Sequence, residues 1–250
     1  MSEERKDDVQ ELYDKSNKFE KCINVNFIIN LGLSILILFD FKFRDFFIFI
    51  SMFSNVIYVI LTNINEFYFK NEAETERRKS FIKESFNIDI TTKETTKYYN
   101  NNEEPSIEKL GINCYESVFF TQKIVNKMML LEIIKIGIIA IIYVILLNQI
   151  NNFDVLLMAT QTLFSAEVLF KFITLCFYRN QLERICKKFE EICFVLGINY
   201  ENAKVLFLDT TMDYECLKSY CRIPISSKIF FKNNEKWSKE WDKLYKKIKR

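Results

Sequence analysis

The stretch FFIFISMFSNVIYVILTNIN, residues 46–65, decides the fold, because it runs for 20 residues without a charge. A bilayer core about 30 Å thick is spanned by roughly 20 apolar helical residues. This stretch therefore has the length and the composition of a transmembrane helix. The mean hydropathy of the whole chain lies near zero, but the average hides the pattern, since the apolar residues are concentrated in blocks and the charges lie between them.

Three further blocks are apolar over a similar length, although Glu167 and Lys171 interrupt the last of them. The three blocks cover residues 22–39 (CINVNFIINLGLSILILF), 136–153 and 155–177. The alternative is a soluble bundle with buried helices, which usually show a polar face every third or fourth residue. Residues 32–39 and 137–147 have no such face. We therefore predict an all-α membrane protein with four spans.

The spans pair into two transmembrane helical hairpins, because only residues 40–45 join the first pair and 151–154 join the second. Links as short as these make neighbouring helices antiparallel. The sequence thus predicts five segments. They are a cytoplasmic amino-terminal helix (1–21), hairpin 1 (22–65), a cytoplasmic stalk and loop (66–127), hairpin 2 (128–178) and a cytoplasmic helical tail (179–250).

The distribution of basic residues orients these hairpins. Of 35 Lys and Arg residues, 31 lie in the three segments outside the hairpins. Cytoplasmic loops of membrane proteins carry an excess of Lys and Arg. We therefore expect a multi-pass protein of the bacterial inner membrane with both termini in the cytoplasm. Seven cysteines without a CxxC pair agree with a reducing compartment.

Composition excludes several chemistries. The chain has no His, so a Ser or Cys nucleophile lacks the usual base. Four scattered glycines cannot build a phosphate-binding loop. No carboxylate pair has a catalytic spacing, and we predict neither enzymatic activity, nor a cofactor, nor a metal site. The net charge of +2 gives no signature of nucleic-acid binding, and none is expected.

The segments outside the hairpins are expected to be helical. Residues 66–86 continue the second span as a charged helix, a short strand follows at 88–92, and a new helix begins near 111–113. Gly197 ends the helix that follows the fourth span, and residues 201–220 form another. In residues 234–250, apolar side chains recur at helical spacing from Trp237 to Ile248. This face favours docking on the stalk helices, with an interfacial position on anionic lipid as the alternative.

Polar residues at membrane depth are the candidate functional residues, because such side chains normally face a bundle interior, a subunit contact or water. One stripe lies on the second span and another on the fourth. The candidate pore-lining or subunit-contact residues are Ser51, Asn55, Tyr58, Thr62, Thr160, Gln161, Glu167, Lys171 and Thr174.

Glu167 and Lys171 stand four residues apart in the order that favours an ion pair. Two interpretations follow. The pair locks the helices of one chain or lies near the cytoplasmic rim, where Lys171 reaches the interface. Alternatively, the stripe lines a pore assembled from several chains, since one four-helix unit is too thin to enclose a wide channel.

Several cytoplasmic strings carry a family resemblance. They are AETERRKSFIKESF (73–86), YYN (98–100), NCYESVFFT (113–121), DYECLKSY (213–220) and WSKEWDKL (237–244). With the two hairpins, the chain resembles the bacterial four-transmembrane pore-forming effectors of antiviral conflict systems, which are SMODS-associated and SLATT-like. The resemblance implies an abortive-infection effector.

Such an effector would form homo-oligomers in the lipid bilayer and permeabilise the inner membrane in antiphage defence. The resemblance also implies a trigger, either a cytoplasmic nucleotide signal from a linked synthase or a protein partner. The alternative function is a non-conducting membrane scaffold or partner-binding subunit, in which the cytoplasmic helices recruit a soluble protein. A transporter fits less well, because no span is broken by Gly or Pro.

Overall fold

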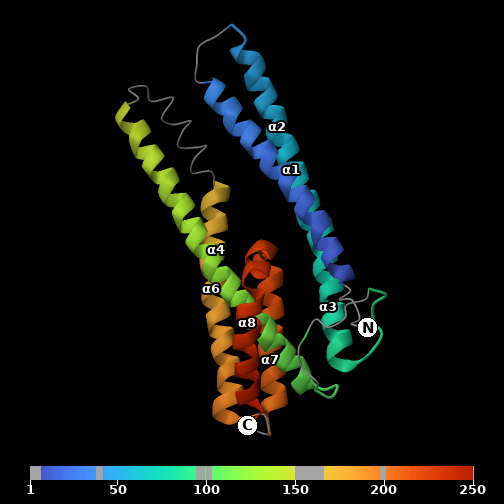
Figure 1. Cartoon of the computed structure of the whole chain (residues 1–250). Helices are drawn as coiled ribbons and strands as arrows, with labels where there is room; N and C mark the ends of the chain where they lie inside the picture. Colours follow the sequence, from blue (N-terminus) through green and yellow to red (C-terminus); the bar gives the residue numbers. More distant parts are fainter. Residues whose placement is uncertain are drawn as a thin grey trace. The chain divides into compact units, whose positions relative to one another are not determined.

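The structure, a computed structural model of the chain, describes residues 7–37, 42–93, 99, 103–149, 166–197 and 201–249. Regular structure in these ranges is helical and includes no β-strand, which confirms the predicted all-α class (Figure 1). The chain divides into two compact units. The hairpin unit comprises Met1–Ser80, Ile90–Tyr98 and Ile139–Ser165, and the bundle unit comprises Phe81–Asp89, Tyr99–Ile138 and Ala166–Arg250.

The hairpin unit is built on two long antiparallel helices (Figure 1). Helix α1 covers Asp8–Ile37, and α2 covers Arg44–Ile64. The second helix continues without a break through a π-helical turn, η1 (Asn65–Lys70), into α3 (Asn71–Phe86). The predicted charged continuation of the second apolar stretch is thus confirmed. Asp7 caps α1, because its Oδ1 accepts a hydrogen bond from the backbone N–H of Gln10 at 3.0 Å.

The bundle unit takes in the last turn of α3 from Phe81, helix α4 as far as Ile138, and the helices α6, α7 and α8 (Figure 1). Helix α4 (Ile107–Gln149) has 43 residues, which corresponds to a length of about 65 Å. Helix α6 (Ala166–Glu190) ends in a second π-helical turn, η2 (Glu191–Leu196), and α7 (Ala203–Cys221) and α8 (Ser227–Ile248) complete the bundle. Gly197 has φ +83°, a conformation in which glycine has no steric penalty, and it ends η2 as predicted.

An aromatic cluster forms the centre of the bundle core. The ring of Tyr115 stacks on Phe189 and meets Trp241 edge-on, each at a centroid distance of 5.3 Å. Trp237, Trp241 and Ile248 of α8 are buried. Docking of the amphipathic carboxy-terminal helix, one of the two predicted alternatives, is therefore what the structure shows.

Two local predictions were wrong. Residues 88–91 have no regular structure, because a strand needs a partner strand and the described chain offers none. Helix α4 begins at Ile107 rather than near 111–113. Ser106 caps it there, since its Oγ accepts a hydrogen bond from the backbone N–H of Lys109 at 3.1 Å.

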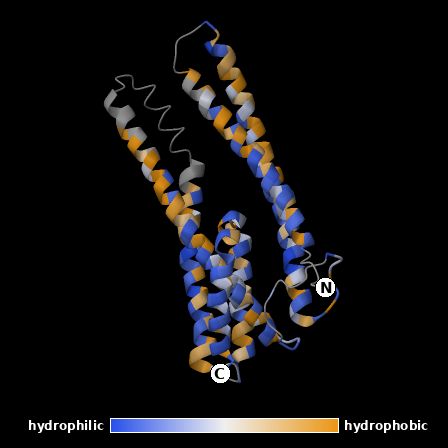
Figure 2. Ribbon diagram, in the orientation of Figure 1, coloured by the Kyte–Doolittle hydropathy of each residue, from blue (hydrophilic) through white to orange (hydrophobic). Residues whose placement is uncertain are grey.

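One helix in the described chain is long and apolar enough to cross a membrane, the continuous helix Arg44–Phe86. Only 6% of its apolar window is buried. Figure 2 shows apolar residues along α2 and the upper part of α4, and polar residues along α3. Residues 150–165, which hold the second hairpin tip and half of the fourth predicted span, lie outside the described residues.

Candidate functional site

The polar stripe predicted on α2 is partly buried and partly exposed. Tyr58 turns toward α1, with its ring 6.4 Å from that of Phe27. Thr62 is half-buried, and its Oγ1 is enclosed without a hydrogen-bond partner. Ser51 is also half-buried, whereas Asn55 is exposed. Within the stripe, Tyr58 therefore packs against α1, whereas Asn55 is exposed.

A reciprocal hydrogen-bonded pair lies between α1 and α2. The hydroxyl of Ser54 donates to Oδ1 of Asn26 at 2.6 Å, and Nδ2 of Asn26 donates to the carbonyl oxygen of Ser54 at 3.1 Å. Each of the two residues thus satisfies polar groups of the other between two apolar helices. Bonds of this kind between membrane helices contribute about 0.6 kcal/mol on average. The pair sets the register of α1 against α2 more than it adds stability.

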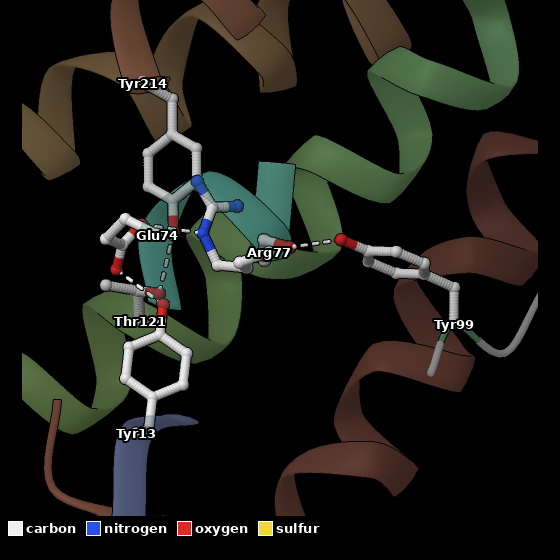
Figure 3. Close-up of polar contacts among 7 residues, drawn as sticks. Tyr13, Glu74, Arg77, Tyr99, Thr121 and Tyr214 are labelled. Atoms are coloured by element: carbon white, nitrogen blue, oxygen red, sulfur yellow. Dashed lines mark hydrogen bonds and ion pairs between the residues drawn. The ribbon is translucent and has the colours of Figure 1, made fainter. Parts of the chain in front are cut away.

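The π-helical turn η1 carries a second polar contact that periodicity alone did not reveal. Asn65 is buried, and its Oδ1 accepts a hydrogen bond from the hydroxyl of Ser16 at 2.9 Å. Below it, the hydroxyl of Tyr13 donates to Glu74 at 2.6 Å, and Nε of Arg77 donates to the same carboxylate at 2.8 Å (Figure 3). The amino-terminal part of α1 is therefore held to η1 and α3 by polar contacts. The only signal in the sequence was Asn65 at the end of an apolar run.

The stripe predicted on the fourth span is described only in part. Thr160 and Gln161 lie outside the described residues, and so does the side chain of Glu167. Lys171 is exposed on α6, and Thr174 is half-buried. Whether Glu167 and Lys171 form the predicted ion pair stays a prediction.

Two polar contacts fasten the bundle around its aromatic core, and both appear in Figure 3. The hydroxyls of Thr121 on α4 and Tyr214 on α7 lie 3.0 Å apart in a buried position. The hydroxyl of Tyr99 lies 3.1 Å from that of Ser117. These bonds connect segments that are up to 93 residues apart in the sequence, so they fix which helices are neighbours.

A groove of ≈ 270 Å³ lies between α4 and α6 in the bundle. Charged side chains that line this groove already form hydrogen bonds with their neighbours. Nε of Arg179 donates to Asn126 at 2.7 Å, and Nζ of Lys187 donates to Glu183 at 2.9 Å. Cys186 also lines it, and burial raises the pKa of that thiol to about 12. A thiol with this pKa stays protonated at neutral pH and is a poor nucleophile.

The other buried cysteine of α6–η2 behaves in the same way. Burial raises the pKa of Cys193 to about 12, and its side chain packs in the bundle core. Cys186 and Cys193 are thus packing residues of the bundle core. Within the described ranges, no three His, Cys, Asp or Glu side chains are grouped so as to hold a metal ion.

Fold and site together define a helical protein in which apolar helices continue directly into a polar, well-packed bundle. No protein-family model, curated protein or solved structure matches the chain. The resemblance to bacterial pore-forming effectors consequently stays a prediction.

Proposed function

We propose that the chain is a four-span effector of the bacterial inner membrane, with the bundle and both termini in the cytoplasm. In this proposal several copies assemble and permeabilise the membrane in antiphage defence, on a cytoplasmic nucleotide or protein cue. The resemblance of the cytoplasmic strings to such effectors supports the biological setting. The physical features of the helices support the membrane and the assembly.

The observation that carries the membrane part is the outward apolar surface of the long helices. On α2, large side chains such as Phe46, Phe49 and Val56 are exposed. The same holds for α4 at Leu130, Leu131, Ile133, Ile134, Ile138, Ile141 and Val144, and for α6 at Phe170, Ile173 and Phe177. Contiguous apolar surface of this extent is unusual on a soluble monomer and is typical of a membrane or protein contact. Lipid is the environment that stabilises it along whole helices.

The assembly part is supported by a polar side chain within this surface. Asn55 is exposed between the exposed residues Phe53 and Val56. A polar side chain is costly in contact with lipid and faces other helices or water instead. A second copy of the chain provides other helices, and a pore between copies provides water.

A leakage assay tests the proposal. Purified protein reconstituted into dye-loaded vesicles should release the dye, and the double variant Glu167→Leu, Lys171→Leu should insert but release little. The matched control is Glu132→Leu, Lys135→Leu, which removes an ion pair of 3.4 Å on α4 and should leave release unchanged. Undiminished release by the Glu167 and Lys171 variant would exclude those two residues from the pore.

A non-conducting scaffold is the second candidate, and the surface of α7 favours it. Val205, Leu208, Met212 and Tyr220 are exposed along α7 at nearly helical spacing. An apolar stripe on a water-exposed helix is a common recognition surface for another protein. Absence of leakage at every protein density, together with stable insertion, would favour the scaffold over the pore.

A further inference from the structure

The connection between α7 and α8, taken together with the end of α7 and the first turns of α8 (residues 220–234), combines exposed aromatic rings with positive charge, and we call it the elbow. Tyr220 is 79% exposed and Phe231 is 66% exposed. The elbow holds Arg222, Lys228 and Lys232 and no acidic residue. All three basic side chains are exposed. Exposed aromatic and basic side chains together are typical of segments that lie at a membrane surface.

The elbow is held in place by the bundle core. Ile223 and Ile225 are half-buried and pack against the core cluster. Arg222 adopts a left-handed conformation with φ 45° and closes α7, and the hydroxyl of Ser226 caps α8 by accepting from the N–H of Ile229 at 3.4 Å. The exposed rings of Tyr220 on α7 and Phe231 on α8 therefore lie on two helix ends whose connection packs against the core.

The elbow lies at the level where the bundle helices change from polar to apolar. Nε of Arg179 reaches Oδ1 of Asn126 at 2.7 Å, and one turn further Cys176 contacts Met129, with their sulfurs 3.9 Å apart. At the level of these contacts the exposed apolar surface begins, at Leu130 on α4 and at Phe177 on α6. This boundary is where the helices would enter a membrane.

Both ends of the elbow contact residues of α4 and α6 at that boundary. The ring of Tyr220 lies 6.0 Å from that of Phe177 on α6. Nζ of Lys127 on α4, one turn before Leu130, donates to Oδ1 of Asn233 at 2.6 Å. The exposed aromatic and basic residues of the elbow thus lie beside the first exposed apolar residues of α4 and α6.

We propose that the elbow docks on the anionic lipid surface of the membrane that α4 and α6 enter. Tyr220 and Phe231 would lie among the headgroups, and the three basic side chains would attract anionic lipid phosphates, which favour Lys and Arg close to the surface. The assignment rests on the membrane embedding in the proposed function. Docking of the elbow would fix the position of the bundle on the bilayer. Movements of the bundle would then be transmitted to the membrane-spanning helices.

Quenching of tryptophan by brominated phosphatidylcholine tests the position of the elbow in the full-length chain. Phe231→Trp should lose most of its added fluorescence in such vesicles, and Tyr220→Trp provides a second reporter if one variant fails to fold. The native Trp237 and Trp241 are buried in the bundle and form the background. Val195→Trp is the matched control, because Val195 is 76% exposed in η2 and should not be quenched.

Phe49→Trp on α2 separates the two proposals. If Phe49→Trp is quenched while both elbow reporters behave like Val195→Trp, the elbow does not touch lipid and the membrane embedding still stands. If Phe49→Trp is not quenched either, the membrane embedding fails as well. Quenching at 49 and at both elbow positions, with none at 195, supports the elbow proposal.

The lipid charge is tested by adding phosphatidylglycerol to the vesicles. Quenching of Phe231→Trp should rise with this anionic lipid. The rise should be lost when Arg222, Lys228 and Lys232 are replaced by Gln. Replacing the exposed Lys243, Lys246 and Lys247 near the other end of α8 removes the same charge and should leave the rise intact. A rise that survives the elbow substitutions would overturn the assignment of anionic lipid as the partner.

Discussion

At Gly111, helices α4 and α7 approach so closely that no side chain fits between them. A Cβ built at this position would lie 2.3 Å from Cδ1 and 2.7 Å from Cβ of Phe207, which is itself fully buried. Because the Cβ of Phe207 belongs to the rigid part of its side chain, the helices themselves would have to move apart. A single missing methyl group thus determines how tightly α7 packs.

We expect Gly111→Ala to lower the free energy of unfolding of the bundle by about 1–3 kcal/mol, the usual cost of overpacking. Thermal unfolding in detergent, followed by near-ultraviolet circular dichroism, measures the change. Gly137→Ala is the matched control in the same helix, because nothing lies within 4 Å of a Cβ there. Equal stability of the two variants would contradict the close approach.

Helix α8 inserts one large aromatic side chain into the bundle core. Trp241 is fully buried, with its ring 5.3 Å from that of Tyr115 and 5.5 Å from that of Phe119. Trp241→Ala should cost about 3–5 kcal/mol, the range for truncation of a large buried aromatic residue. Protease sensitivity of residues 227–249 should rise accordingly. Phe194→Ala, at an exposed aromatic residue of η2, should leave both properties unchanged.

The end of α8 is fastened by a carboxylate that precedes α4. Glu103 accepts hydrogen bonds from the side chains of Tyr245 and Lys249. Burial raises the pKa of Glu103, but the bonds from Lys249 and Tyr245 outweigh it, and the net pKa lies below its usual range. The resulting stabilisation is complete above the pKa of an unfolded Glu, about 4.3. It is lost as the pH falls through the lowered pKa of the folded state.

Acidification below about pH 4 should therefore release the last turn of α8. Amide hydrogen exchange of residues 245–249, corrected for its intrinsic pH dependence, measures this release. Glu103→Gln should show faster exchange already at neutral pH and a weaker dependence on pH. Asp242→Asn, which changes an exposed carboxylate of α8, serves as the control. A variant at Glu103 that exchanges like the natural chain would show that the carboxylate does not fasten α8.

At the scale of the whole molecule, the proposed topology places the bundle on the cytoplasmic side. Cys216 is an exposed thiol on α7, and the other exposed thiol, Cys22, is on α1. In a Cys22→Ser background, a membrane-impermeant maleimide should label the chain rapidly in inverted vesicles and slowly in intact cells. The further substitution Cys216→Ser should abolish the rapid labelling. Rapid labelling of intact cells would reverse the orientation.

Much of the helical structure was predictable from local pattern. The continuation of residues 46–65 into a charged helix, the end of η2 at Gly197 and the buried face of Trp237 and Trp241 all follow from periodicity and residue preference. The strand expected at 88–92 is absent. A strand is stabilised by a partner strand, and the local sequence pattern does not show whether there is one.

For the candidate site, the sequence predicted which polar residues lie on the helices but not which of them are buried or what they contact. Periodicity placed Asn55 and Tyr58 on one polar face of a helix, but packing turns Tyr58 toward α1 and leaves Asn55 exposed. The groove between α4 and α6 and the polar contacts of Tyr13 with Glu74 had no local signal at all.

The sequence by itself determined that the chain is helical and where apolar stretches give way to charged ones, because both depend on residues near one another along the chain. Only the tertiary structure decided which faces meet, such as Asn26 with Ser54 and Gly111 with Phe207. It also placed the elbow beside the start of the apolar surface. Such pairings depend on the register between helices distant in sequence, and that register is set by packing rather than by local periodicity.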